Sequence, residues 1–186
     1  MAIQKDSQMA NRYGLDTKLY KYGTHGTEGA TALMNIPFAN ISEIDISGDT
    51  VWATGGQSHG NIVGFNNPLT GSFKLSTQIV TQELLALIAG QDVEAVGDTI
   101  VFENTSNATM PAYFTITSET VWQDKEGNTY GENLVFHKAI AKRALNIQYN
   151  GEGDPVSIDV EFELAQDDEG KVLTITKAKK DEEAGE

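Results

Sequence analysis

The stretch that decides the fold is GFNNPLTGSFKLSTQIVTQELLALIAG, residues 64–90. Apolar and polar side chains alternate over residues 72–79, a period of two that is typical of a half-buried β-strand. Thr81 is of a residue type that caps helix N-termini, and Gly90 is of the type that ends helices in a left-handed conformation. The stretch therefore predicts a strand that leads into one short helix.

The predicted helix is apolar over a broad arc, which comprises Leu84, Leu85, Leu87 and Ile88. A helix that lies in solvent keeps a wide polar face, whereas an arc of this width needs another layer to cover it. We therefore expect the helix to pack against a sheet.

Period-two alternation recurs through the remainder of the chain and predicts further strands. The candidates are residues 15–22, 41–47, 61–65, 99–103, 112–121, 134–149, 156–164 and 172–176. Residues 134–145 also contain good helix formers, but the continued alternation of Leu145, Ile147 and Tyr149 favours a strand, continuous or broken, over a helix. Turn-forming residues separate the candidates, and residues 167–170 are expected to close a final hairpin.

These patterns predict a fold that is mostly β with one α-helix. A chain of 186 residues is of ordinary size for one domain, so we expect a single domain over residues 1–186. The two ends lack an apolar pattern. They are expected to form a mobile N-terminal arm, residues 1–11, and a mobile acidic C-terminal tail, residues 178–186.

The charge of the chain is strongly acidic, with 27 acidic and 13 basic residues and a formal net charge of −14. The imbalance is concentrated in residues 39–124, where Lys74 is the one basic residue among ten acidic ones. Affinity for nucleic acid comes mainly from cations that release counterions, so this chain is not expected to hold DNA or an anionic membrane. An acidic surface that only confers solubility is the simpler alternative.

The chain has no cysteine, which excludes disulfides, thiolate metal sites and a cysteine nucleophile. The N-terminus is polar, and no stretch approaches the roughly 20 apolar residues that a membrane-spanning helix needs. We therefore expect a soluble protein that is made in the cytoplasm and has no membrane anchor.

The hexapeptide GGQSHG, residues 55–60, matches the G-x-S-x-G spacing of the serine hydrolase nucleophile elbow at Ser58. An elbow needs a buried strand before the serine and a helix after it, but a short strand and a turn are predicted after Ser58. The histidines, His25, His59 and His137, stand singly and lack the spacing of a metal site. We expect no catalytic residue, no metal and no cofactor, and hence no enzyme.

Aromatic residues allow a different kind of binding site. Trp52 and Trp122, with Tyr113 and Phe114, are of the types that stack on sugar rings, although packing in a β-sandwich core is their commoner use. A carbohydrate-binding β-sandwich is therefore kept as an alternative.

The order of parts along residues 12–177 resembles a known family. A Gly/Thr-rich loop (23–31) is followed by the acidic strand ISEIDISG, the strand and helix of residues 64–90, and a β-rich second half that includes GDPVSIDVEFEL, residues 153–164. This succession resembles the major tail proteins (tail tube proteins) of tailed bacteriophages, particularly those of Gram-positive hosts. The resemblance implies a β-sandwich or split-barrel subunit with one flanking helix.

The resemblance also implies a structural virion protein whose rings of six copies stack into a tube that conducts DNA. Its partners would be other copies of itself and, in the tail, the tape measure, tail terminator and distal tail or baseplate proteins. DNA would pass through without specific binding, and the protein would reside in the virion after assembly in the host cytoplasm. The tube component of a contractile injection or secretion apparatus shares this fold and is kept as the second alternative.

Alternation also places acidic side chains in rows along two predicted strands, opposite apolar side chains. In a ring these rows are expected to face the lumen, and on an isolated subunit they would be a solvated face. The lumen-facing candidates are Glu43, Asp45, Asp159, Glu161 and Glu163.

An apolar cluster lies in the loop-like region after residue 31. It suggests burial against a neighbouring subunit, although a solitary domain would bury it equally well. The subunit-interface candidates are Leu33, Met34, Ile36 and Phe38.

Overall fold

The computed structural model describes residues 9–37, 39–55, 60–94, 97–102, 112–148 and 157–179. Its strands are β1 (Met9–Lys21), β2 (Met34–Pro37), β3 (Asn40–Ser47), β4 (Thr50–Gly55), β5 (Gly60–Asn66), β6 (Thr70–Thr77), β7 (Phe114–Asp124), β8 (Thr129–Ala141), β9 (Asn146–Gln148), β10 (Ser157–Ala165) and β11 (Leu173–Lys179), and the helix is α1 (Gln82–Ala89). The predicted class, mostly β with one α-helix, is confirmed for these residues.

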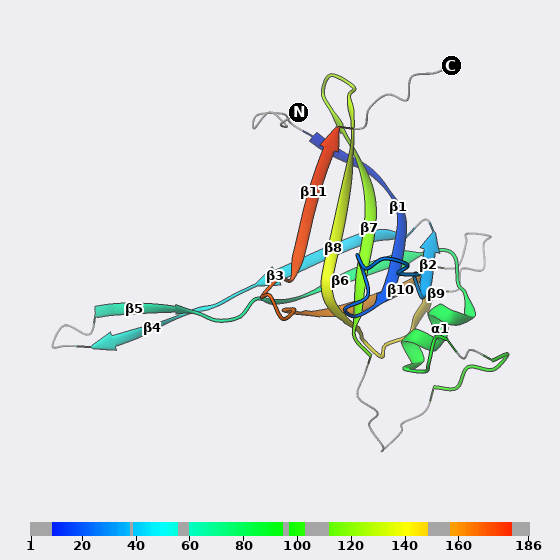
Figure 1. The fold of residues 1–186 in the computed structure, drawn as a ribbon, viewed down its shortest axis with the longest axis horizontal. Coiled ribbons are helices and arrows are strands. Elements are labelled where there is room, and N and C mark those ends of the chain that lie inside the picture. The colour runs from blue at the N-terminus through cyan, green and yellow to red at the C-terminus, as the bar shows by residue number, and fades with distance from the viewer. Residues whose placement is uncertain are drawn as a thin grey trace.

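One antiparallel sheet contains most of the strands, in the order β2-β1-β7-β8-β10-β6-β3, with β11 added to β8 and β9 added to β10. The sheet curls, so that β3 at one end contacts β1 near the other end although the two strands are not paired. In Figure 1, β1, β7, β8 and β11 run along one direction, and β3 and β6 cross them. The described part is therefore an open, split barrel with a core between the crossing strands.

The sheet branches at β8, because both β10 and β11 pair with this strand. The N-terminal half of β8 pairs with β11 from Tyr130 to Phe136, and its C-terminal end pairs with β10 from Lys138 to Ala141. Residues 167–170 therefore connect two strands on the same side of β8, and the predicted final hairpin between β10 and β11 is wrong.

A hydrogen-bonded turn holds the connection from β10 to β11 in place. One carboxylate oxygen of Asp167 accepts the backbone N–H groups of Glu169 and Lys171, at 2.9 and 2.7 Å. The other lies 3.2 Å from Nδ1 of His137, whose Nε2 is 2.8 Å from the hydroxyl of Thr174. Asp167 and its contacts to His137 thus hold this connection in place, and β10 does not pair with β11.

The strand predicted over residues 134–149, in place of a helix, is present as two strands, β8 and β9, which are separated by residues 142–145 and both pair with β10. Strands β2 and β4 were not predicted, and residues 99–102 form no strand. Residues 9–11 and 178–179, which the sequence placed in mobile ends, belong to β1 and β11. The remainder of both ends lies outside the described residues.

The core is built around three fully buried phenylalanines from neighbouring strands, Phe73 of β6, Phe136 of β8 and Phe162 of β10. The ring of Phe73 stacks on that of Phe136 at 4.0 Å and on that of Phe162 at 4.8 Å between centroids. Aliphatic side chains of the same sheet and of α1 surround the rings, among them Leu19, Leu75, Leu84, Ile88, Ile116 and Val160.

Helix α1 begins and ends as the sequence predicts. The Thr81 side chain accepts the backbone N–H of Leu84, and Gly90 ends the helix in the left-handed region at φ 76°. Leu84, Leu87 and Ile88 are buried in the core, which confirms that the apolar arc packs against the sheet.

Replacing Thr81 with alanine is expected to lower the free energy of unfolding by about 1 kcal/mol, because the helix loses its N-terminal cap. Urea denaturation of the variant and the wild type measures the difference. Thr81→Ser keeps an oxygen that can accept the same hydrogen bond and should unfold close to the wild type. An equal loss in both variants would show that the methyl group of Thr81 matters and the cap does not.

Asp124 organises the turn between β7 and β8. Its carboxylate accepts the side-chain amide of Asn128 and the backbone N–H groups of Asn128 and Glu126, at 2.8, 2.8 and 2.9 Å. These hydrogen bonds, that of the Asn128 side chain foremost, hold the pKa of Asp124 below its ordinary value of 3.8. The stabilisation they provide is present at neutral pH and is lost as the pH falls through this lowered pKa.

Replacing Asp124 with asparagine is therefore expected to lower stability at neutral pH and to make the loss of stability below pH 3.8 shallower. Urea midpoints measured across this range compare the variant with the wild type. The control is Glu126→Gln, which removes an exposed charge from the same turn. Parallel curves for Asp124→Asn and the wild type would contradict the assignment.

Candidate assembly surfaces

An acidic face lies across three neighbouring strands, β3, β6 and β10. Glu43 of β3 and Glu161 of β10 both pair in register with Lys74 of the central strand, and Asp45 and Glu163 both pair with Ser72. Asp159 pairs with Ser76, one step further along β6. The structure thus brings the five predicted acidic residues to one region of one sheet, which we call the acidic face.

Two lysines partly neutralise the acidic face. Lys74 donates to Glu43 at 2.6 Å, and Lys142, which follows β8, donates to Glu161 at 2.9 Å and lies 4.0 Å from Glu163. The hydrogen bond from Lys142 lowers the pKa of Glu161, and the hydrogen bond to Glu43 raises the pKa of Lys74. Five carboxylates against two ammonium groups leave the face with a net negative charge at neutral pH.

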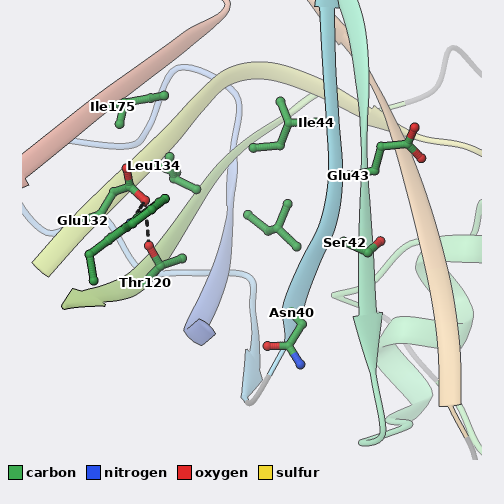
Figure 2. Close-up of a pocket in the computed structure, with 10 residues that line it drawn as sticks. Asn40, Ser42, Glu43, Ile44, Thr120, Glu132, Leu134 and Ile175 are labelled. Atoms are coloured by element: carbon green, nitrogen blue, oxygen red, sulfur yellow. Dashed lines mark hydrogen bonds between the residues drawn. The ribbon is translucent and has the colours of Figure 1, made fainter. Parts of the chain in front are cut away.

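The alternation predicted for β10 is confirmed by burial. Val160, Phe162 and Leu164 are buried, whereas Asp159 and Glu163 on the other face are exposed and Glu161 is half-buried. Figure 2 shows the same arrangement on β3, where Ile44 and Glu43 point to opposite sides of the strand. The side of this sheet opposite the acidic face is therefore the core.

Two strand edges next to the acidic face are unpaired within the described residues. Strand β3 is the last strand on its side and pairs with β6 alone, and β9 pairs with β10 alone. An unpaired edge presents backbone N–H and C=O groups that can join a strand of another chain. These edges bound the four strands β3, β6, β10 and β9, the first three of which carry the acidic face.

A projecting arm is formed by β4 and β5, which pair with each other and form a sheet of their own. Figure 1 shows it extending from β3 and β6, away from the remainder of the domain. Residues 50–73 contain no acidic residue and no lysine or arginine. Because an isolated two-stranded hairpin is marginally stable in water, an uncharged arm of this kind is suited to packing against another chain.

A cavity of about 500 Å³ opens between β3 and the strands β7, β8 and β11. Ile44 points into it from β3, while Leu134 of β8 and Ile175 of β11 lie on its other side (Figure 2). Ile44 is 40% exposed and Ile175 is 53% exposed, although both lie on the core side of their strands. The cavity is thus an uncovered part of the core, beside the free edge of β3.

A buried carboxylate that the sequence did not predict lies at the polar end of this cavity. Glu132 is 6% exposed, accepts hydrogen bonds from the Thr120 hydroxyl at 2.8 Å and from the Trp122 indole, and lies 3.3 Å from Nζ of Lys177. The same ammonium lies 4.0 Å from the centre of the Trp122 ring. Only the pairing of β7, β8 and β11 brings these residues together.

The described aromatic residues of the carbohydrate-binding alternative are already engaged within the subunit. Lys177 lies over one face of the Trp122 ring, whose indole N–H is bonded to Glu132. Phe114 is buried. The ammonium group of Lys138 lies over the rings of both Tyr113 and Tyr22. The side chain of Trp52 lies outside the described residues.

The predicted interface cluster is divided by the structure. Met34 and Ile36, on β2, are buried in the subunit's own core, and Leu33 packs against it. The pairing of β2 with β1 directs both side chains into the core, so little of their surface is accessible to a second subunit. The interface expectation is therefore corrected for these two residues, and Phe38 lies outside the described residues.

The hydrolase motif does not have the setting of a nucleophile elbow. Ser58 itself is not among the described residues, but the strands before and after it, β4 and β5, pair as a hairpin, and no helix follows. His137 is held between Asp167 and Thr174, and none of these three lines the cavity. No group of His, Asp and Glu residues in the described ranges is arranged to hold a metal ion.

These features define a mostly β protein whose described residues form an open sheet with unpaired edges at β3 and β9, an acidic face between those two edges and a projecting uncharged arm. Within the described ranges, α1 is too short to span a membrane.

No protein-family model and no curated protein matches the chain. Among solved structures, it is similar to one titled "Crystal structure of Hcp protein", with a TM-score of 0.32 and 11% identity over 89% of this chain and 99% of that chain. These values are too low for a function to be transferred.

Proposed function

We propose that this protein is a tube subunit, of the kind that forms the tail tube of a bacteriophage. Copies join edge to edge into rings of six, and the rings stack into a conduit through which DNA leaves the virion. The observation that carries the proposal is the acidic face. It spans three hydrogen-bonded strands and ends at β3, an edge that has no partner in the described residues.

The acidic face lines the lumen in this proposal. Glu43, Asp45, Asp159, Glu161 and Glu163 then surround the axis, repeated in every copy. Charges are screened over about 8 Å at physiological salt, so DNA in the bore stays within reach of the wall. A wall with net negative charge repels phosphate and offers few cations on which DNA would stick, and this favours fast passage.

Edge pairing explains how the rings close. The two free edges beside the acidic face, β3 and β9, differ, so one copy joins the next head to tail, and a head-to-tail contact that closes by rotation gives a cyclic assembly. Closure satisfies the backbone groups of these two edges, because a closed inner barrel has no edge strand. The projecting arm of β4 and β5 then packs against a further copy, which supplies the support that an isolated hairpin lacks.

In the assembled tail, this role places the protein in the virion, with the tape measure protein inside the tube and the tail terminator and baseplate proteins at its ends. A gene for a sheath protein beside the gene of this chain would assign the tube to a contractile apparatus.

Negative-stain microscopy of the purified protein at high concentration tests the proposal directly. Rings or tubes with a central hole are the expected result. Uniformly dispersed monomers, at every concentration and salt tested, would overturn it. Dispersed monomers that bind a glycan array would favour the carbohydrate-binding alternative, with Trp52 as the first residue to replace.

A further inference from the structure

The acidic face and the adjoining strand β9 are bounded by two edges, at β3 and at β9, and these two margins differ in charge. On the β3 margin lie Glu43 and Asp45, and β3 contains no basic residue. Within the described residues, Asp45 is exposed and makes no hydrogen bond or ion pair through its side chain. On the opposite margin, Lys142 stands at the break between β8 and β9, and its side chain is 45% exposed.

The two margins also differ in shape. Beside β3 lies the open cavity, with the exposed side chain of Ile44 at its mouth. At the other margin Leu145, which directly precedes β9, is 41% exposed. One margin therefore has an uncovered apolar hollow, and the other has an exposed apolar side chain.

We infer that β3 of one copy pairs with β9 of the next copy, so that Leu145 of the second copy covers the cavity beside Ile44 of the first. The inference rests on the proposed function and names the joint between neighbouring copies. Backbone pairing continues the sheet across the joint, because β9 and β3 bound the same four strands. The lysine margin then meets the carboxylate margin, with Lys142 on the side of Asp45.

The charge arrangement favours this joint over a symmetric one. Two copies that each carry a net charge of −14 repel one another unless their contact surfaces differ in sign. A joint between two β3 edges would bring Glu43 and Asp45 of both copies together, which is unfavourable for like charges on neighbouring strands. The β3 to β9 joint is heterologous, as ring closure requires.

Cysteine cross-linking tests the joint, and the chain is suited to it because it has no native cysteine. The variant carries Ser42→Cys on β3 and Asn146→Cys on β9, and a short bismaleimide reagent joins thiols that lie close together. We expect a ladder of covalent oligomers, up to the closed ring, on a denaturing gel. Each single-cysteine variant should give dimers at most.

The matched control carries Thr176→Cys on β11 with Asn146→Cys on β9. Thr176 is exposed, but β11 takes no part in the proposed joint, so this pair should give no ladder. Microscopy of the same samples separates two kinds of failure. If rings form and only the control pair cross-links, the joint is wrong and the tube function stands; if neither rings nor a ladder form, both are overturned.

A second variant tests the apolar part of the joint. Leu145→Glu places a charge over the cavity of the neighbouring copy and is expected to raise the concentration needed for assembly at least about tenfold, a loss of about 1.4 kcal/mol per joint. Leu145→Met keeps the apolar contact and should assemble as the wild type does. Because Leu145 is exposed in the subunit, unfolding in urea should be nearly the same for all three. Normal assembly of Leu145→Glu would contradict the inference.

Discussion

Replacing Phe162 with alanine is expected to lower the free energy of unfolding by about 3–5 kcal/mol. Phe162 is fully buried and stacks on Phe73, so the substitution leaves a cavity where the rings of β6, β8 and β10 meet. For a domain of this size, the melting temperature should fall by about 2–4 °C for each kcal/mol. Urea denaturation followed by tryptophan fluorescence measures the loss.

The control for this variant is the next residue along the strand. Glu163→Ala changes an exposed side chain on the opposite side of β10 and should alter stability by no more than about 0.5 kcal/mol. A loss below about 1 kcal/mol for Phe162→Ala would mean that the phenylalanine stack contributes little to the stability of the core.

In the proposed tube, reversing the charge of the β10 row is expected to have the largest effect on DNA passage. The variant Asp159→Lys, Glu161→Lys, Glu163→Lys replaces three carboxylates of the acidic face with cations. Lysines in the lumen would bind the phosphate groups of the DNA. If such contacts together hold the DNA by about 1.4 kcal/mol, its movement along the lumen slows tenfold. Genome release from particles with this variant should therefore be slower by about tenfold or more, and less so at high salt.

The matched control removes the same charges without adding cations. Asp159→Asn, Glu161→Gln, Glu163→Gln keeps the size of the side chains and provides no phosphate-binding site, so release should stay close to that of the wild type. Tails of normal length that release DNA at the wild-type rate in the lysine variant would place the acidic face away from the lumen.

Much of the fold is predictable because its signals are local. The N-cap at Thr81 and the C-cap at Gly90 depend on the hydrogen bonds and dihedral angles of a single turn, and both are in place. The alternation along β10 is likewise local, since side chains on a strand point to opposite faces whatever strand lies alongside. The two faces of this strand were therefore predictable from its residues.

Strand partners were not predictable in the same way. Residues 167–170 have the composition of a hairpin turn, but Asp167 and His137 hold them to β8, so that β10 and β11 share a partner. The cluster at residues 33–38 is apolar enough for an interface, yet its pairing with β1 directs Met34 and Ile36 into the core. Both outcomes depend on residues distant in sequence.

The sequence by itself determined helix α1, most of the described strands and the separation of acidic from apolar side chains, because each depends on neighbouring residues along one segment. Only the tertiary structure decided that the two acidic strands flank β6, that the cavity stays open beside β3, and that Glu132 meets Trp122 and Lys177. These features arise from strand register and packing, which are fixed by side-chain contacts between segments far apart in the chain.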